Sequence, residues 1–254
     1  MSRVVGIISG KGGVGKTTLA LNMAAALGRH YGMRTALVDC NVTTSHIALH
    51  LGNYHYPRTL NHVLRGEANI HEASYDIFDG VNLVPASISL RDLEGIDIVN
   101  LKDNVRELAE KHDIVLLDSA PGLGREAMGA LRAADEVVMV ANPNVLSVTD
   151  LLRCSEVCEE LGVKPVGIIM NMVHRDRYEI DRQEVERLTG IPVIGSIPYH
   201  HKMRRSTSMH APLVLMKPKD KVSREIIRLT SHVAGLPYPY ATRFEGLRRR
   251  LRLL

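Results

Sequence analysis

Aromatic residues and cysteines are scarce in this sequence, and each scarcity excludes a class of protein. There is no Trp and there are only two Phe and eight Tyr, so a folded core must be mainly aliphatic. The three cysteines, Cys40, Cys154 and Cys158, are too few for a disulfide framework and indicate a reducing cytosol. Cys154 and Cys158 lie one helical turn apart, but two thiols do not complete a metal site, so we expect small buried hydrophobic residues.

Long apolar runs are also missing. No stretch approaches the roughly 18 apolar residues of a membrane-spanning helix, and the first apolar run is too short for a secretory signal. The 254 residues, 45% hydrophobic and 24% charged, suit one large α/β domain. Lys and Arg exceed Asp and Glu by four, and residues 243–254 account for this excess with five Arg against one Glu. The remainder of the chain is therefore about neutral.

Short apolar stretches that predict buried strands alternate along the chain with stretches of helical periodicity. The strands are expected at 4–9, 35–39, 82–85, 114–118, 137–141, 166–170 and 193–197, and the helices at 16–30, 101–111, 148–161, 181–189 and 221–234. Such alternation predicts an α/β fold, in which helices on both faces cover a mostly parallel sheet with right-handed crossovers. We divide the chain into a domain at 1–235, a Pro- and Tyr-containing linker at 236–242 and a basic segment at 243–254.

A glycine-rich loop joins the first strand to the first helix. Its pattern, Gly10-x-x-x-x-Gly15-Lys16-Thr17, is that of a phosphate-binding loop in its usual strand–loop–helix context. The glycines let successive backbone N–H groups turn inward, so that they and the helix N-terminus bind phosphate oxygens. Lys16 is expected to reach the β- and γ-phosphates, and the Thr17 hydroxyl to bind Mg²⁺. The loop predicts ATP and Mg²⁺ as cofactors.

A second lysine, Lys11, stands early in this loop. With it the loop resembles that of the deviant P-loop ATPases, the family that includes MinD, ParA and the nitrogenase iron protein. In that family the early lysine reaches across a homodimer to the partner's nucleotide, which implies an ATP-dependent dimer; alternatively, Lys11 only adds charge to its own loop. The resemblance implies ATP contacts from Gly10, Lys11, Gly12, Gly13, Val14, Gly15, Lys16, Thr17 and Thr18.

Two acidic segments at strand ends resemble the switches of the same family. In the segment from Asp118 to Gly122, the resemblance implies that Asp118 holds Mg²⁺ through water and that Pro121 and Gly122 form the second switch. In the first switch, Asp39 matches an acid of an Asp-x-Asp motif and is a candidate for Mg²⁺ or water binding. Asn41 replaces the second acid, and an amide cannot take a proton from the attacking water. We therefore expect slow or partner-dependent hydrolysis, with Lys11, Lys16, Asp39 and Asn41 as the catalytic candidates.

Three later segments are similar to nucleotide- and partner-facing parts of MinD. Asn171 resembles the Asn that binds the adenine edge, and Pro198 belongs to an Ile-Pro pair that lines the base pocket. His200 and His201 follow this pair, where relatives often carry an acid, and we interpret them as surface or base-pocket residues. Asp150 resembles an acid that pairs with the early lysine before dimerisation. A helix dipole that favours an acid in the first turn explains Asp150 equally well.

The basic C-terminal segment has an apolar stripe. Phe244, Leu247, Leu251 and Leu254 recur at helical spacing, and Arg248 flanks them. A short basic amphipathic helix of this kind binds at an anionic membrane interface, as the similar tails of MinD-type proteins do. The segment could instead dock on its own domain or bind nucleic acid.

Together these features predict a MinD-like ATPase that dimerises with ATP and positions partner proteins from the inner face of the cell membrane. The alternatives are a ParA-like DNA-partition ATPase, an iron–sulfur carrier and a scaffold that binds ATP and barely hydrolyses it. The near-neutral charge of the domain argues against nucleic acid as a partner, since DNA binding needs a basic face. The pattern of the cysteines argues against the iron–sulfur carrier.

Overall fold

One sheet of eight strands forms the centre of the molecule. The computed structural model describes residues 2–174 and 176–240. The strand order is β3-β4-β2-β5-β1-β6-β7-β8, and all neighbours are parallel except β3 and β4. The seven predicted strands and the mostly parallel sheet are confirmed, while β3 was not predicted. The strands are β1 (Arg3–Ile8), β2 (Thr35–Asp39), β3 (Tyr75–Phe78), β4 (Val81–Val84), β5 (Ile114–Asp118), β6 (Glu136–Ala141), β7 (Lys164–Val173) and β8 (Val193–Pro198).

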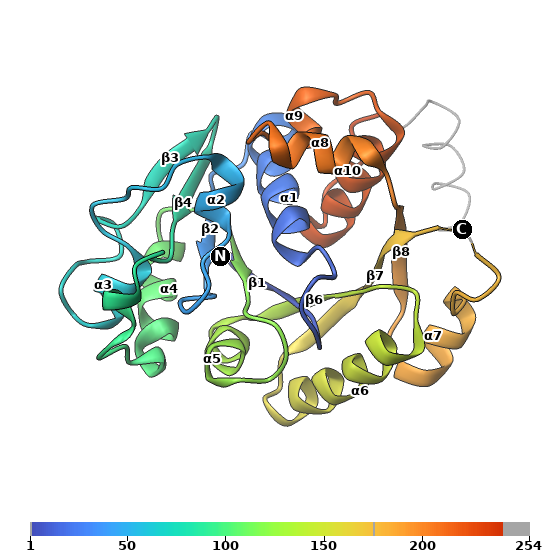
Figure 1. Ribbon diagram of the computed structural model, residues 1–254, viewed down its shortest axis with the longest axis horizontal. Helices are drawn as coiled ribbons and strands as arrows, with labels where there is room; N and C mark the ends of the chain where they lie inside the picture. Colours follow the sequence, from blue (N-terminus) through green and yellow to red (C-terminus); the bar gives the residue numbers. More distant parts are fainter. Residues whose placement is uncertain (1, 175, 241–254) are drawn as a thin grey trace.

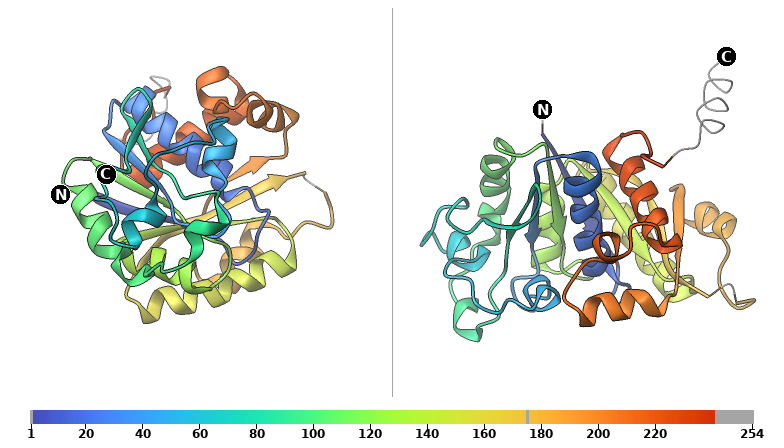
Figure 2. Two further views of the ribbon diagram at one scale, coloured as in Figure 1. Left: turned by 60° about the vertical axis from the view of Figure 1, so that its left-hand side comes forward. Right: turned by 90° about the horizontal axis from the view of Figure 1, so that it is seen from above.

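Helices cover both faces of this sheet, as Figures 1 and 2 show. The helices α1, α8, α9 and α10 lie above the sheet in the view of Figure 1, and α5, α6 and α7 lie below it. The α-helices are α1 (Lys16–Tyr31), α2 (Ile47–Leu51), α3 (Leu60–Leu64), α4 (Leu101–Ala109), α5 (Arg125–Ala133), α6 (Val145–Glu160), α7 (Arg182–Thr189), α8 (His201–Ser208), α9 (Leu213–Met216) and α10 (Lys221–Ala234). Two single 3₁₀ turns, η1 (Leu90–Leu93) and η2 (Ile98–Asn100), precede α4.

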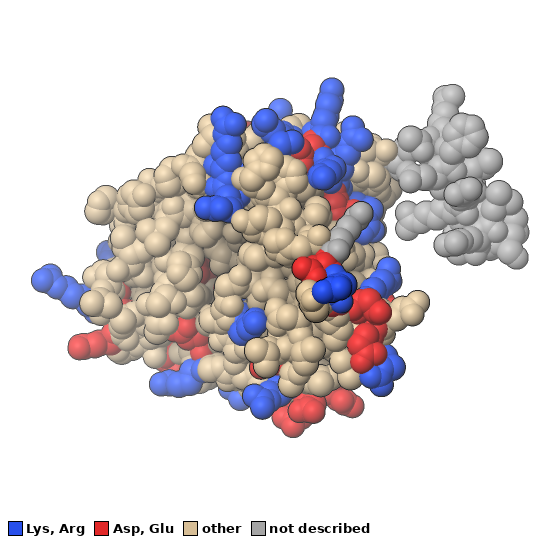
Figure 3. Space-filling view, turned by 45° about the vertical axis from the view of Figure 1, so that its right-hand side comes forward, with Lys and Arg blue, Asp and Glu red and all other residues tan. Residues whose placement is uncertain are grey.

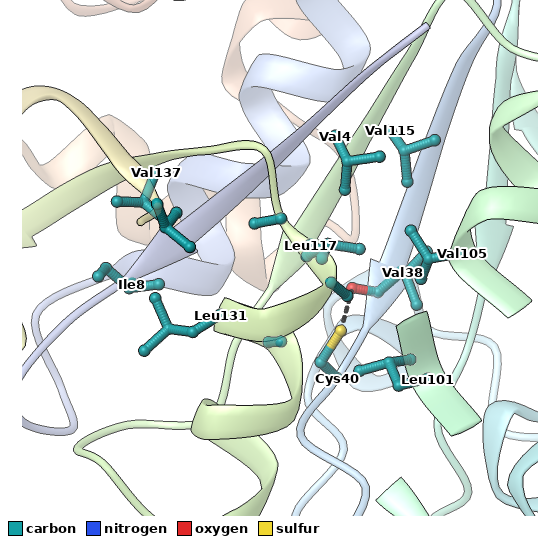
Figure 4. Close-up of a cluster of buried hydrophobic side chains, with 14 of the residues drawn as sticks. Val4, Ile8, Val38, Cys40, Leu101, Val105, Val115, Leu117, Leu131 and Val137 are labelled. Carbon is teal, nitrogen blue, oxygen red and sulfur yellow. Dashed lines mark hydrogen bonds between the residues drawn. The ribbon is translucent and has the colours of Figure 1, made fainter. Parts of the chain in front are cut away.

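The central strand β1 separates two aliphatic cores. Successive side chains of a strand point to opposite faces, so Val4 and Ile8 join the core under α3–α7, whereas Val5 and Ile7 join the core under α1, α9 and α10. Figure 4 shows part of the first core, where Cys40 lies among Val and Leu side chains. Because β1 is buried on both faces, its sequence is a continuous apolar run, as is typical of parallel sheets.

The three cysteines are buried, which confirms the prediction made for Cys154 and Cys158. Burial raises the pKa of Cys154 to about 12 and that of Cys158 to about 11, so both thiols stay protonated at neutral pH. Within the described ranges there is no group of three or more His, Cys, Asp or Glu side chains placed to hold a metal ion. None of the helices described here has the length and apolar character needed to cross a membrane. The apolar stripe with Phe244, and the predicted membrane segment around it, lie outside the described residues.

Helix α6 begins earlier than predicted. Asn144 caps it by accepting a hydrogen bond from the Ser147 backbone N–H at 2.9 Å, so the first turn starts at Val145. Asp150 therefore stands in the second turn of α6, and the first turn holds no acid. The interpretation of Asp150 as an acid placed by the dipole of the first turn is wrong, because that effect falls off within one turn.

Candidate functional site

The order of the strands brings the predicted site residues together at one edge of the sheet. Strand β5 lies between β1 and β2, so the glycine loop after β1, Asp39 at the end of β2 and Asp118 at the end of β5 meet there. Asp39 and Asp118 are partners in the register of β2 and β5. The carboxyl ends of parallel strands are the usual place for a ligand in this class of fold.

Glycines shape the loop because other residues would not fit. Gly13 and Gly15 have positive φ angles of 79° and 87°, which favour glycine. A Cβ atom at Gly10 would stand 2.2 Å from the Cβ of Asp150, so α6 approaches the loop too closely for any side chain. Gly15 is also the N-cap of α1 and offers no side chain to its free N–H groups. The open N-terminus of α1 is therefore available to an anion.

Lys16 and Asp118 form a buried pair behind the loop. The Lys16 Nζ lies 3.9 Å from Asp118 Oδ1, and the two residues are 8% and 1% exposed. Burial raises the pKa of Asp118, and Lys16, the Thr17 hydroxyl, His50 and His46 lower it in part. Asp118 Oδ1 is buried without a hydrogen-bond donor.

A carboxylate oxygen without a donor, next to a hydroxyl, fits a hard cation such as Mg²⁺, which prefers oxygen ligands. Thr17 and Asp118 are thus the residues that would hold Mg²⁺, directly or through water. The ion would supply positive charge to the phosphates held by the loop. Lys16 stands on the first turn of α1 and adds its own charge at the same place.

The second acid, Asp39, has its oxygens occupied. Its carboxylate accepts hydrogen bonds from the Ser45 hydroxyl at 2.9 Å and from the backbone N–H groups of Asn41, His46 and Ile47 at 3.2–3.3 Å. Burial, and then the charge of Asp118, raise the pKa of Asp39 to about 7. Asp39 holds the first switch and the start of α2, and its predicted contact with Mg²⁺ or water remains a prediction.

Asn41 closes a tight turn in the first switch. Its amide donates to the Thr44 carbonyl at 2.8 Å and accepts from the Thr44 hydroxyl at 3.0 Å. Asn41 and Thr44 line a cavity of about 490 Å³, whose opposite wall is the second switch with Pro121. The Gly122 N–H of that switch donates to the Ser9 carbonyl at 2.9 Å, so the second switch is tied to the start of the glycine loop.

Lys11 and Lys16 contact different residues, Lys11 at the start of α6 and Lys16 at the end of β5. The Lys11 ammonium donates to Asn144 Oδ1 at 3.5 Å, at the start of α6, and it makes no ion pair with Asp150 in the described structure. Two apolar side chains that follow Asn144, Val145 and Leu146, are 66% and 73% exposed. The second lysine of the loop thus stands beside an exposed apolar surface.

The predicted base-binding residues surround one small cavity. Gly15, Thr18, Asn171 and Pro198 line this space of about 70 Å³, together with Tyr199, His200, Met203 and Arg204. The Asn171 amide donates to the Val14 carbonyl at 2.7 Å, and a Cβ atom at Gly15 would stand 2.4 Å from this amide nitrogen. Asn171 therefore braces the glycine loop, and its contact with adenine stays a prediction. The cavity has room for the edge of a planar base beside the loop.

The structure adds His50, which the sequence did not single out. This residue of α2 lies with its Nε2 3.3 Å from the Thr18 hydroxyl and its Nδ1 2.8 Å from the His46 carbonyl. It links the helix that Asp39 holds to the residue after Thr17. Nothing in the local sequence signals this contact, because α2 has only five residues.

Comparison with known proteins agrees with this site. The model of the AAA domain family matches residues 2–162, and that of the NUBPL iron-transfer P-loop NTPase family matches residues 97–234. An uncharacterized ATP-binding protein of Methanocaldococcus jannaschii is 31% identical, over 94% of this chain and 90% of its own. The septum site-determining protein MinD of Synechocystis is 27% identical over 99% of each chain.

Solved structures of MinD superpose on the fold. The cell division ATPase MinD of Pyrococcus furiosus gives a TM-score of 0.88 at 31% identity, and covers 93% of this chain and 100% of its own. MinD of Pyrococcus horikoshii, solved with Mg-ADP, gives 0.87 at 31% identity, with 92% and 96% covered. The glycine loop, the buried acids behind it and these similarities agree, and the chain therefore belongs to the MinD/ParA family of P-loop ATPases, which bind ATP with Mg²⁺.

Proposed function

We propose that this ATPase forms a homodimer around ATP, that residues 243–254 then hold the dimer on an anionic membrane at the inner face of the cell, and that it positions partner proteins there. The observation that carries the dimer is the placement of Lys11. Its ammonium lies outside the cradle of its own loop, at 3.5 Å from Asn144 and beside the exposed Val145 and Leu146. A second copy that approaches this surface would cover the apolar pair and bring its nucleotide to Lys11.

The direct experiment is size-exclusion chromatography with MgATP, with MgADP and without nucleotide. We expect a dimer with MgATP alone, and Lys11→Gln to remain a monomer while it still binds ATP in calorimetry. A monomer under all three conditions, or a Lys11→Gln dimer as stable as the wild type, would contradict the proposal.

Membrane binding depends in this proposal on the apolar stripe of the C-terminal segment. Replacing Leu247 and Leu251 together by Glu is expected to abolish sedimentation with phosphatidylglycerol vesicles in MgATP, because buried apolar side chains and two copies per dimer are both needed for stable attachment. The matched control is Leu90→Glu, at a leucine of η1 that is 80% exposed, and ATP binding checks that both variants are folded. Equal sedimentation of the double variant and the wild type would exclude this role for the stripe.

The proposal of a partner protein rests on a relative of lower sequence identity. The MinC:MinD complex of Aquifex aeolicus contains a MinD that is 26% identical to this chain, with a TM-score of 0.81. We propose that this chain likewise presents a dimer surface to a second protein, whether a division inhibitor, a component of a surface appendage or a chemosensory array. The identity of that protein does not follow from the nucleotide site.

Asn41 supports a second candidate, a dimer that holds ATP for long periods and acts as a scaffold. Both polar atoms of its amide are engaged by Thr44, so neither takes a proton from water. Replacing Asn41 by Asp is expected to raise the ATP turnover of the dimer by about 10²-fold, which is the usual contribution of a general base. The measurement is phosphate release at saturating MgATP, with Asn53→Asp, at an exposed residue outside the nucleotide site, as the control. An unchanged rate would show that position 41 does not limit hydrolysis.

A further inference from the structure

The charge of the domain is divided between two parts of the chain. Residues 199–240 carry eight Lys and Arg against two acids, whereas residues 1–198 carry nineteen against twenty-five. The near-neutral domain is thus the sum of a basic part and an acidic part. A net charge near zero is therefore compatible with a basic binding face, because binding depends on where the charges lie.

The basic part forms one face over α8, α9 and α10, and we call its six exposed cations the basic face. Figure 3 shows Lys and Arg side chains gathered along the top of the molecule, where these helices lie. The two acids of this region are neutralised, Asp220 by Lys202 and Glu225 by Arg228. No ion pair is found in the described structure for the six remaining cations, which are Arg204, Arg205, Lys217, Lys219, Lys221 and Arg224.

The chain leaves the domain beside this face. Tyr240, the last described residue, has its ring 6.0 Å from the Arg224 guanidinium and its hydroxyl 3.5 Å from His30. The segment that follows adds five arginines. Two exposed large side chains accompany the cations. Tyr240, of a residue type that is enriched at lipid interfaces, is 38% exposed, and the apolar Met209 at the end of α8 is 52% exposed.

We propose that the basic face lies on the anionic membrane and binds lipid headgroups as a second contact, separate from residues 243–254. This inference rests on the proposed membrane function and deepens it. Unpaired cations near an anionic surface attract it additively, and a folded face that is already in place loses little freedom on binding. The mixture of cations with exposed Met and Tyr favours a lipid surface over nucleic acid, whose phosphates need no apolar contact.

The test removes three charges and leaves the nucleotide site untouched. The full chain with Lys217→Gln, Lys219→Gln and Lys221→Gln keeps Asp220, which caps α10 through the Val222 N–H. Binding is measured with vesicles of phosphatidylcholine that contain phosphatidylglycerol, in MgATP. We expect the partition coefficient to fall on the order of 100-fold, since each lysine near the surface contributes about a factor of five. The matched control replaces the exposed lysines Lys102, Lys111 and Lys164 by Gln and should bind as the wild type does.

The outcomes separate this inference from the proposed function. If the triple variant and the control bind vesicles equally while the variant with Leu247→Glu and Leu251→Glu does not, the basic face has no role and the proposed function stands. If the wild type itself does not bind the vesicles, the proposed membrane function and the proposed role of the basic face are both contradicted. If the triple variant binds vesicles normally but loses salt-sensitive binding to duplex DNA, the face is a nucleic-acid surface and the inference is overturned.

Discussion

Replacing Lys16 by Gln is expected to lower ATP turnover by about 10²- to 10³-fold, which is the usual cost of removing one charge that stabilises the transition state. Lys16 stands on the first turn of α1, 8% exposed, with its ammonium 3.9 Å from Asp118 Oδ1. It is therefore already directed into the site and does not need to be ordered by the nucleotide. A neutral amide at this position leaves the phosphates with the backbone N–H groups of the loop and with Mg²⁺, and without the charge of a lysine.

The experiment pairs phosphate release with calorimetry of MgATP binding. We expect Lys16→Gln to lose both, whereas Lys11→Gln keeps binding and loses only the dimer-dependent rate, because Lys11 contacts Asn144 and not the cradle. Folding is checked by circular dichroism, where both variants should give the spectrum of the wild type. A Lys16→Gln protein that binds MgATP as tightly as the wild type would remove the central role assigned to this lysine.

The parallel sheet was predictable from the sequence because its inner strands are buried on both faces. Such strands are continuous apolar runs, as in β5, where all five residues are buried. β3 was not predicted because it is a short edge strand whose four residues are all partly or fully exposed, so its sequence is not a continuous apolar run. α5 was not predicted because Gly129 stands within it, although that glycine is needed where a Cβ atom would stand 2.5 Å from the Ile98 side chain.

The sequence motifs predicted which residues form the site, but they did not predict how these residues are arranged in space. The residues of the loop follow one another, so the motif predicts roles for Lys16 and Thr17, and the resemblance to the deviant P-loop family predicts one for Lys11. That Asp39 and Asp118 lie side by side depends on β5 entering the sheet between β1 and β2, which no local pattern determines. For the same reason the contact of His50 with Thr18, and the support of the loop by Asn171, became visible only in the fold.

The nucleotide-free protein is expected to lose stability as the pH rises toward neutrality, because two carboxylates share a buried site with one ammonium group. The pKa of Asp39 rises from 3.8 to about 7 through burial and the charge of Asp118. The folded state then binds a proton that the unfolded state releases, so the stabilisation is complete below pH 3.8 and is lost as the pH passes about 7. At about 1.4 kcal/mol for each pKa unit, the free energy of unfolding falls on the order of 4–5 kcal/mol over this window.

Asp118→Asn is expected to reduce this loss. The substitution removes the second cause of the raised pKa of Asp39 but not the first, which is burial, so the dependence on pH becomes smaller and does not vanish. Urea unfolding without Mg²⁺ or nucleotide, at about pH 5 and about pH 8, measures the difference. Asp103→Asn, an exposed change of the same chemistry, should keep the slope of the wild type. A slope for Asp118→Asn as steep as that of the wild type would show that the two carboxylates do not interact.

The same substitution should nearly abolish turnover, by about 10²-fold or more, because the amide offers Mg²⁺ a weaker ligand than the carboxylate. The pH dependence of stability and the ATP turnover would then fall together in a single variant. This joint loss is the expected mark of a binding site for a cation, because Asp118 Oδ1 is buried without a hydrogen-bond donor and has the Lys16 ammonium, at 3.9 Å, as its counter-charge until the ion arrives. Adding Mg²⁺ with ADP should accordingly stabilise the wild type more at about pH 8 than at about pH 5, and should stabilise Asp118→Asn equally at both.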